Sequence, residues 1–147
     1  MTGFWIFAAA LNAFVAVGMG AFATHGLKGR VVPGALEWID TASSYGLIHA
    51  VALLAVSLFA ASRRDGPGDG PGDGPGDKPG DKPSLRYVPV TQAALLFGCI
   101  FFSGPLYIMG LTGLTFLGAV VPLGGTAFLL AWLTLMIAGL RWSTARS

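Results

Sequence analysis

FWIFAAALNAFVAVGMGAFA, the stretch from Phe4 to Ala23, contains one strongly polar side chain, that of Asn12. The hydrocarbon core of a bilayer is about 30 Å thick, and a helix needs about 20 apolar residues to cross it. This stretch therefore predicts a transmembrane helix. Further apolar runs predict more crossings at Tyr45–Ala61, Tyr87–Leu111 and Leu114–Leu140. We expect an all-α integral membrane protein whose four transmembrane helices form one bundle.

The composition agrees with a membrane protein, because charged residues make up only 11% of the chain and its mean hydropathy is +0.69. Five of the seven acids and five of the nine bases fall between Arg63 and Arg86, so the rest of the chain has few groups that water would solvate. No basic patch interleaves with stacking aromatics, which argues against a nucleic-acid partner. The single cysteine, Cys99, excludes an internal disulfide.

A cleaved signal peptide is the alternative for the first run, because Ala21-Phe22-Ala23 resembles a small-residue cleavage site. The preceding Met1–Gly3 carries no Lys or Arg, and the apolar run is long for a signal peptide. We therefore expect the first run to remain as a span.

Two segments between the spans differ in character. Lys28–Ser44 has apolar residues on one helical face and Pro33 near its start, which predicts a short interfacial helix of about three turns, with a plain loop as the alternative. Residues 64–86 repeat Gly, Pro and Asp with a period of four, which predicts a disordered linker within a single domain of residues 1–147. Collagen requires a period of three, and the Asp spacing does not match an EF-hand loop.

The orientation follows from the positive charges, since Lys and Arg favour the cytoplasmic side. With four spans, both termini share one side with the linker. That side carries seven bases (Arg63, Arg64, Lys78, Lys82, Arg86, Arg141 and Arg146), and the other carries Lys28 and Arg30. We therefore expect a multi-pass protein of the plasma membrane with its N- and C-termini in the cytoplasm.

Four polar residues are expected near the outer face. His25 lies about 32 Å along a helix from Phe4, and His49 lies near the outer start of the second span. Ser103 and Tyr107 approach the outer end of the third. We predict that His25, His49, Ser103 and Tyr107 line a common polar pocket. The alternatives are an interfacial His25, a neutral His49 satisfied by a neighbouring helix, and a Tyr107 that belongs to the aromatic belt.

A second set of residues predicts close helix packing. Small or polar residues recur every fourth position along the first span, which lets two backbones approach within the bundle or between protomers. Pro122, Gly124 and Gly125 are expected to loosen the fourth span. The predicted packing residues are Asn12, Ala16, Gly20, Pro122, Gly124 and Gly125.

No catalytic, cofactor or metal motif is present: the sequence has no HExxH, GxSxG or P-loop, and two histidines make at most half of a metal site. The spans contain no Asp or Glu. We expect a non-enzymatic membrane or assembly component in the lipid bilayer, as a homo-oligomer or with a membrane-complex partner. The alternative is a small channel or transporter that uses the histidine pocket.

Four motifs resemble those of the DUF423 (UPF0382) family of small bacterial inner-membrane proteins. Gly20–Gly29, GAFATHGLKG, is similar to the family's GAFGAHALKG, and Tyr45–Leu54, YGLIHAVALL, is similar to YQMYHALALL. Phe102–Tyr107, FSGPLY, and Val121–Gly125, VPLGG, resemble FSGSLY and TPLGG. The resemblance touches all four spans and implies four transmembrane helices, a plasma-membrane location and no established activity. Gly46 and Pro105 depart from the family's usual Gln and Ser, so a polar site at those positions is expected to differ here.

Overall fold

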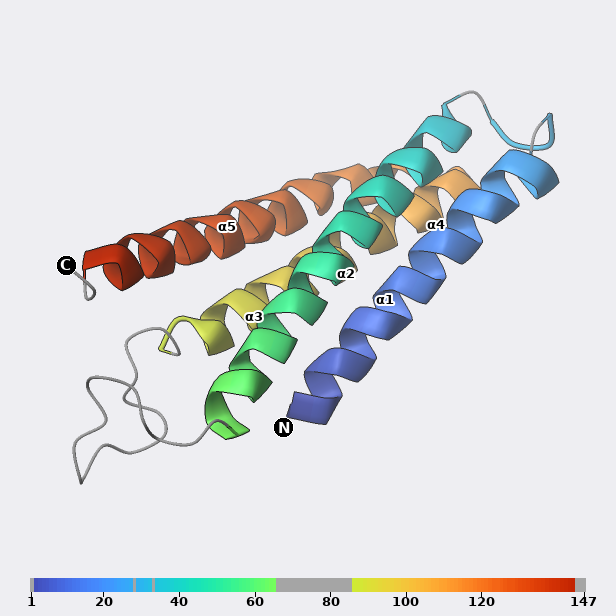
Figure 1. Ribbon diagram of the computed structural model, residues 1–147. Helices are drawn as coiled ribbons and strands as arrows, with labels where there is room; N and C mark the ends of the chain where they lie inside the picture. The colour runs from blue at the N-terminus through green and yellow to red at the C-terminus, as the bar shows by residue number, and fades with distance from the viewer. Residues whose placement is uncertain (1, 28, 33, 66–85, 145–147) are drawn as a thin grey trace.

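The computed structural model describes residues 2–27, 29–32, 34–65 and 86–144. The predicted disordered linker lies almost wholly outside the described residues. Every regular element within them is helical. In chain order they are α1 (Thr2–Phe22), η1 (Ala23–Leu27), α2 (Ala35–Asp65), α3 (Val88–Gly98), η2 (Cys99–Ser103), α4 (Gly104–Thr112), η3 (Thr115–Ala119) and α5 (Val121–Thr144) (Figure 1).

The prediction of four transmembrane helices is confirmed. Four continuous helical segments are long and apolar enough to cross a bilayer: Thr2–Leu27, Ala35–Arg63, Val88–Thr112 and Thr115–Arg141. Large apolar side chains cover the outside of the bundle, and Phe14, Phe116 and Leu129 are each more than 70% exposed. Such surfaces suit hydrocarbon rather than water.

The predicted interfacial helix is not confirmed as a separate element. Residues 35–44 form the first turns of α2, which runs for 31 residues without a break from Gly34, whose φ is +84°. Ala35, Ile39 and Ala42 are fully buried, and Ile39 packs against Gly110 of α4. The apolar face that suggested an interfacial helix is thus buried inside the bundle. Extending an existing helix also avoids the cost of a new helix nucleus.

The third span is one helix with a widened turn. α3 and α4 are joined by η2, a π-helical turn that ends just before Pro105. Proline has no N–H to donate, and its ring crowds the carbonyl four residues earlier, here that of Phe101. A π-turn is a recognised way of absorbing such a break. The widened turn therefore lies directly before Gly104-Pro105.

The last two spans are joined by a capped turn followed by a 3-10 helix. α4 ends at Gly113, whose φ of +77° is left-handed and whose N–H donates to the Met109 carbonyl at 2.8 Å. Glycine suits this position because it has no Cβ to strain the backbone. The 3-10 helix η3 then leads into α5.

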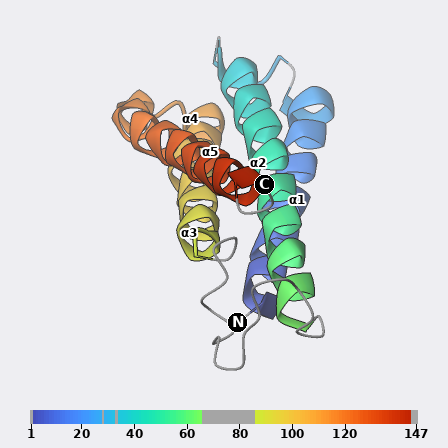
Figure 2. The ribbon, with the colours of Figure 1, turned by 60° about the vertical axis from the view of Figure 1, so that its left-hand side comes forward.

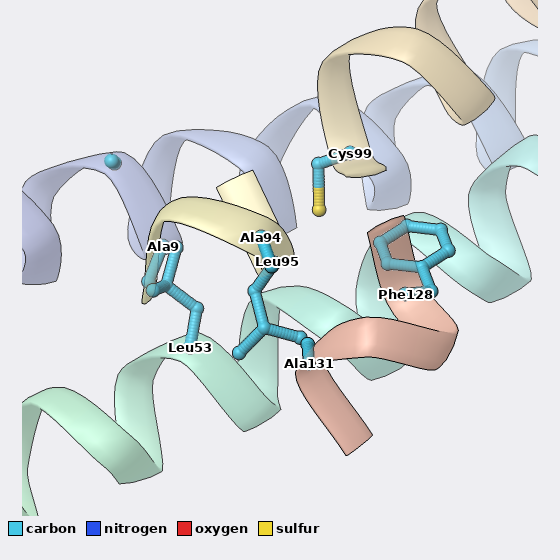
Figure 3. Close-up of a cluster of buried hydrophobic side chains, with 8 residues drawn as sticks. Ala9, Leu53, Ala94, Leu95, Cys99, Phe128 and Ala131 are labelled. Carbon is cyan, nitrogen blue, oxygen red and sulfur yellow. The ribbon is translucent and has the colours of Figure 1, made fainter. Parts of the chain in front are cut away.

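α2 is the central helix of the bundle. It packs along α1 on one side and along α3 and α4 on the other, and α5 packs along α3 (Figures 1 and 2). The start of α1, the start of α3 and the ends of α2 and α5 lie at one end of the bundle (Figure 1). The core is rich in small residues, which let helix backbones approach closely. Its main cluster is Ala8, Ala9, Leu53, Ala94, Leu95, Cys99, Phe128 and Ala131 (Figure 3).

Candidate functional site

A groove of about 450 Å³ lies between α1 and the α3–α4 span, with Gly46 of α2 among its lining residues. The groove exists because α1 packs mainly on α2 and makes few contacts with α3. Its walls are mostly apolar, with Phe4, Phe7 and Leu11 from α1. The side chains of Asn12, Ser103 and Tyr107, together with the Cys99 thiol, are the polar groups that line it.

Ser103 and Tyr107 meet at Gly46. A Cβ atom placed on Gly46 would lie 3.2 Å from the Ser103 Oγ, 3.5 Å from the Tyr107 hydroxyl and 3.6 Å from the Ala16 Cβ. The absence of a side chain at Gly46 therefore lets α1 and the α3–α4 span approach the same point on α2. The resemblance in the sequence leads one to expect Gln at this position, and glycine makes the floor of the groove small rather than polar.

Three hydroxyl groups near this point differ in their hydrogen bonding. Ser103 donates to the Ala42 carbonyl at 2.9 Å and so ties η2 to α2. The Tyr107 and Ser43 hydroxyl oxygens are neighbours, and both are buried without a hydrogen-bond partner of good geometry. A buried polar atom left without a partner is costly, particularly in hydrocarbon. This pair is the least satisfied part of the described bundle.

His49 belongs to a different set of contacts. Its Nδ1 lies 2.7 Å from the Tyr45 carbonyl, and its Nε2 accepts a hydrogen bond from the Trp132 indole at 3.2 Å. Because a carbonyl can only accept, Nδ1 carries the proton and the ring is neutral. The imidazole also stacks on Phe128 with ring centroids 3.5 Å apart. Nδ1 is therefore satisfied within α2, and Nε2 holds α2 against α5, as in the alternative interpretation of this residue.

The four residues predicted to share a pocket are thus divided by the structure. Ser103 and Tyr107 line the groove together, whereas His49 faces Phe128 and Trp132 of α5. His25 lies on η1 with its side chain exposed. The sequence places all four at one depth in the membrane, but depth alone does not say which way each side chain points around its helix.

Two of the predicted packing residues of α1, Ala16 and Gly20, lie toward α2. Ala16 is buried beside Gly46, and a Cβ on Gly20 would lie 3.5 Å from the Ser43 Cβ. Asn12 donates to the Ala8 carbonyl of its own helix at 2.9 Å rather than across the contact.

Gly124 and Gly125 differ sharply in their surroundings. A Cβ on Gly124 would lie 2.3 Å from the backbone nitrogen of Phe102, so α5 touches the π-turn η2 backbone to backbone. A Cβ on Gly125 would meet only the Phe102 ring, at 3.8 Å. Pro122 stands in the first turn of α5, where its missing N–H disturbs no helical hydrogen bond.

Two buried polar pairs in the other half of the bundle were missed by sequence reasoning. Gln92 donates to the Ser57 Oγ at 2.9 Å, and Ser57 donates to the Leu53 carbonyl at 2.7 Å. Thr91 and Thr134 lie 2.8 Å apart, hydroxyl to hydroxyl. All four are at least 92% buried. The sequence shows that each of these polar residues lies in an apolar span. It does not show which residues pair, because that depends on how each helix is rotated about its axis.

The residues that the structure describes contain no group of three His, Cys, Asp or Glu side chains that could hold a metal ion. The arrangement of the groove suits apolar contact and a few hydrogen bonds from hydroxyl and amide groups.

Comparison with known proteins identifies related membrane proteins. The family "Protein of unknown function (DUF423)" matches residues 19–125. The UPF0382 membrane protein YwdK of Bacillus subtilis is 34% identical over 94% of this chain and 97% of its own length. A UPF0382 membrane protein of Staphylococcus epidermidis is 33% identical over 95% of this chain and 97% of its own length. One of Haemophilus influenzae is 33% identical over 86% of this chain and 85% of its own length. No solved structure matches the chain significantly.

Proposed function

Because the chain belongs to the DUF423 family, whose relatives are bacterial membrane proteins, we propose that it is a non-enzymatic component of the plasma membrane that assembles with a second copy of itself. The groove between α1 and the α3–α4 span is the observation that carries this proposal. Its occupant is α1 of the partner protomer.

The exposure of α1 supports this assignment. Only 22% of its apolar segment is buried, compared with 50% for the third span. Phe7 and Phe14 are 64% and 77% exposed, and Phe7 also lines the groove. One helix thus carries both a projecting aromatic side and a wall of the groove. A two-fold dimer needs such a self-complementary surface.

The small floor of the groove supports close helix association. In a bilayer, helices gain little from hydrophobic burial and associate through packing and hydrogen bonds, so small residues mark their interfaces. Gly46 and Ala8 supply such a floor, and the Tyr107 hydroxyl lies beside it. Asn12 adds an amide to the same surface.

The polar contacts of the spans favour a structural role. Ser103 and His49 are the groups most suited to nucleophilic or acid–base chemistry, and they do not bond each other. Ser103 donates to a carbonyl and His49 is held by Tyr45 and Trp132. For the same reason, transport through a titrating histidine is the weaker alternative, because protonation at Nε2 would displace the Trp132 indole.

The positive charges favour the orientation expected from the sequence. Arg63 and Arg141 lie in the last turns of α2 and α5, and Arg86 lies just before α3, so all three belong to the end of the bundle where α1 begins (Figure 1). Arg30 lies between α1 and α2, at the other end. This distribution supports an orientation with both termini in the cytoplasm.

Disulfide trapping in native membranes tests the dimer. In a Cys99→Ala background, Phe7→Cys or Leu11→Cys should give a covalent dimer on oxidation, because both residues face the groove. Leu129→Cys on α5 is the matched control, since it is 71% exposed but lies away from the groove, and it should remain monomeric. Equal trapping at all three positions would indicate random collision. Monomers at every α1 position, including Val15→Cys, would overturn the proposal.

A further inference from the structure

A second cavity, of about 320 Å³, lies between α2, α3 and α5 at the end of the bundle where α1 begins. Its lining is almost entirely apolar and comes from residues such as Phe59, Val88 and Leu135. Space is available because α2 and α5 present Ala55, Ala138 and Gly139 here in place of larger side chains. A Cβ on Gly139 would meet no atom within 4 Å. The cavity is therefore shaped for an alkyl chain and offers little to a polar ligand.

Three arginines stand over the aromatic residues that line this cavity. The Arg63 guanidinium carbon is 5.4 Å from the centre of the Phe59 ring. Those of Arg86 and Arg141 are 5.4 and 5.7 Å from the centre of the Tyr87 ring. Arg86 lies just before α3 and Arg141 near the end of α5, and both contact the Tyr87 ring, so this rim of the cavity is positively charged.

The start of α3 adds to the positive character of this rim. α3 begins at Val88, directly after Arg86 and Tyr87, and no side chain caps its N-terminus. The unpaired N–H groups of a first helical turn favour a nearby anion. This contribution is secondary to the arginines, whose planar guanidinium groups can bond a phosphate through two N–H groups at once.

We infer that this cavity and its arginine rim form a binding site for an anionic phospholipid. One acyl chain lies in the apolar cavity, and the phosphate lies at the rim within reach of Arg86 and Arg141. The bilayer supplies such a molecule at this depth, because the arginines are at the end of the apolar spans where headgroups lie. Basic pockets between transmembrane helices are a recognised mode of anionic headgroup recognition. The site is separate from the groove between α1 and the α3–α4 span.

Native mass spectrometry of the full chain, released from mixed micelles, tests the site with two probes of equal chain length, phosphatidylglycerol and phosphatidylcholine. Wild-type protein should retain phosphatidylglycerol about tenfold or more in preference to phosphatidylcholine, since each arginine near a membrane surface contributes to anionic binding. The double variant Arg86→Gln/Arg141→Gln should lose that preference. Arg30→Gln, which removes an exposed arginine from the opposite end, is the matched control and should keep it.

A cavity-filling variant separates this site from attraction at a charged surface. Gly139→Leu keeps every arginine and should weaken phosphatidylglycerol retention about tenfold. Gly18→Leu, also at a glycine with open space around it, should have no effect. Loss of preference in the arginine variant together with full binding by Gly139→Leu would overturn the proposal, because the lipid would then bind at the surface only. Equal retention of both lipids by wild type would overturn it as well. A circular dichroism spectrum for each variant establishes that it is folded.

Discussion

Trp132 of α5 donates its indole N–H to His49 of α2 at 3.2 Å, and these residues are 83 positions apart in the chain. His49 is 95% buried, and its other nitrogen is held by the Tyr45 carbonyl of its own helix. The contact therefore fixes the rotation of α2 relative to α5. It also assigns to His49 a structural role that its position in the sequence did not distinguish from a functional one.

The His49–Trp132 contact should appear as a coupling energy. We expect His49→Ala and Trp132→Phe to destabilise the bundle by less together than the sum of the single changes, with a coupling of about 1 kcal/mol. Both variants lose the same hydrogen bond, so the second change costs less. The measurement is a double-mutant cycle of unfolding free energies in mixed micelles. Strict additivity would show that the hydrogen bond contributes nothing.

Gly124 should tolerate substitution much less well than its neighbour. Gly124→Ala puts a methyl group 2.3 Å from the Phe102 backbone nitrogen, so α5 must move away from η2. We expect a loss of about 1–3 kcal/mol in unfolding free energy. Gly125→Ala is the control, because its methyl group would make an ordinary contact at 3.8 Å. Helix propensity alone favours alanine at both positions, so equal changes in the two variants would show that the close backbone contact does not determine the effect.

The two members of the Ser57–Gln92 pair should differ in importance. Ser57→Ala leaves the Gln92 amide without the acceptor that it has at 2.9 Å, which we expect to cost about 1–3 kcal/mol. Gln92→Leu removes the amide, but Ser57 keeps its bond to the Leu53 carbonyl, so the cost should be smaller. Unfolding in mixed micelles measures both. A larger loss from Gln92→Leu would show that Gln92 has partners beyond Ser57.

Features set by composition along one helix could be predicted from the sequence. The four spans follow from run length, because the bilayer imposes a nearly fixed thickness. The turn at Gly113 follows from residue type, since glycine adopts the left-handed conformation that ends α4.

Features set by the rotation of one helix against another could not be predicted. Apolar residues cover nearly the whole surface of each span, so the usual contrast between a polar and an apolar face is missing. Consequently, the sequence could not separate His49 from Ser103, or pair Ser57 with Gln92. The first turns of α2 were misassigned for the same reason, because Ile39 could equally have faced lipid or Gly110.

The proposed orientation should appear in cysteine accessibility. In a Cys99→Ala background, Arg30→Cys should react with a membrane-impermeant maleimide on intact cells, because Arg30 is exposed at the end of the bundle assigned to the outside. Arg86→Cys, exposed at the opposite end, should react only after the membrane is permeabilised. Each variant controls the other, since both carry one exposed cysteine at a former arginine. The reverse pattern would place the termini outside and would move the arginine-rimmed cavity to the outer leaflet.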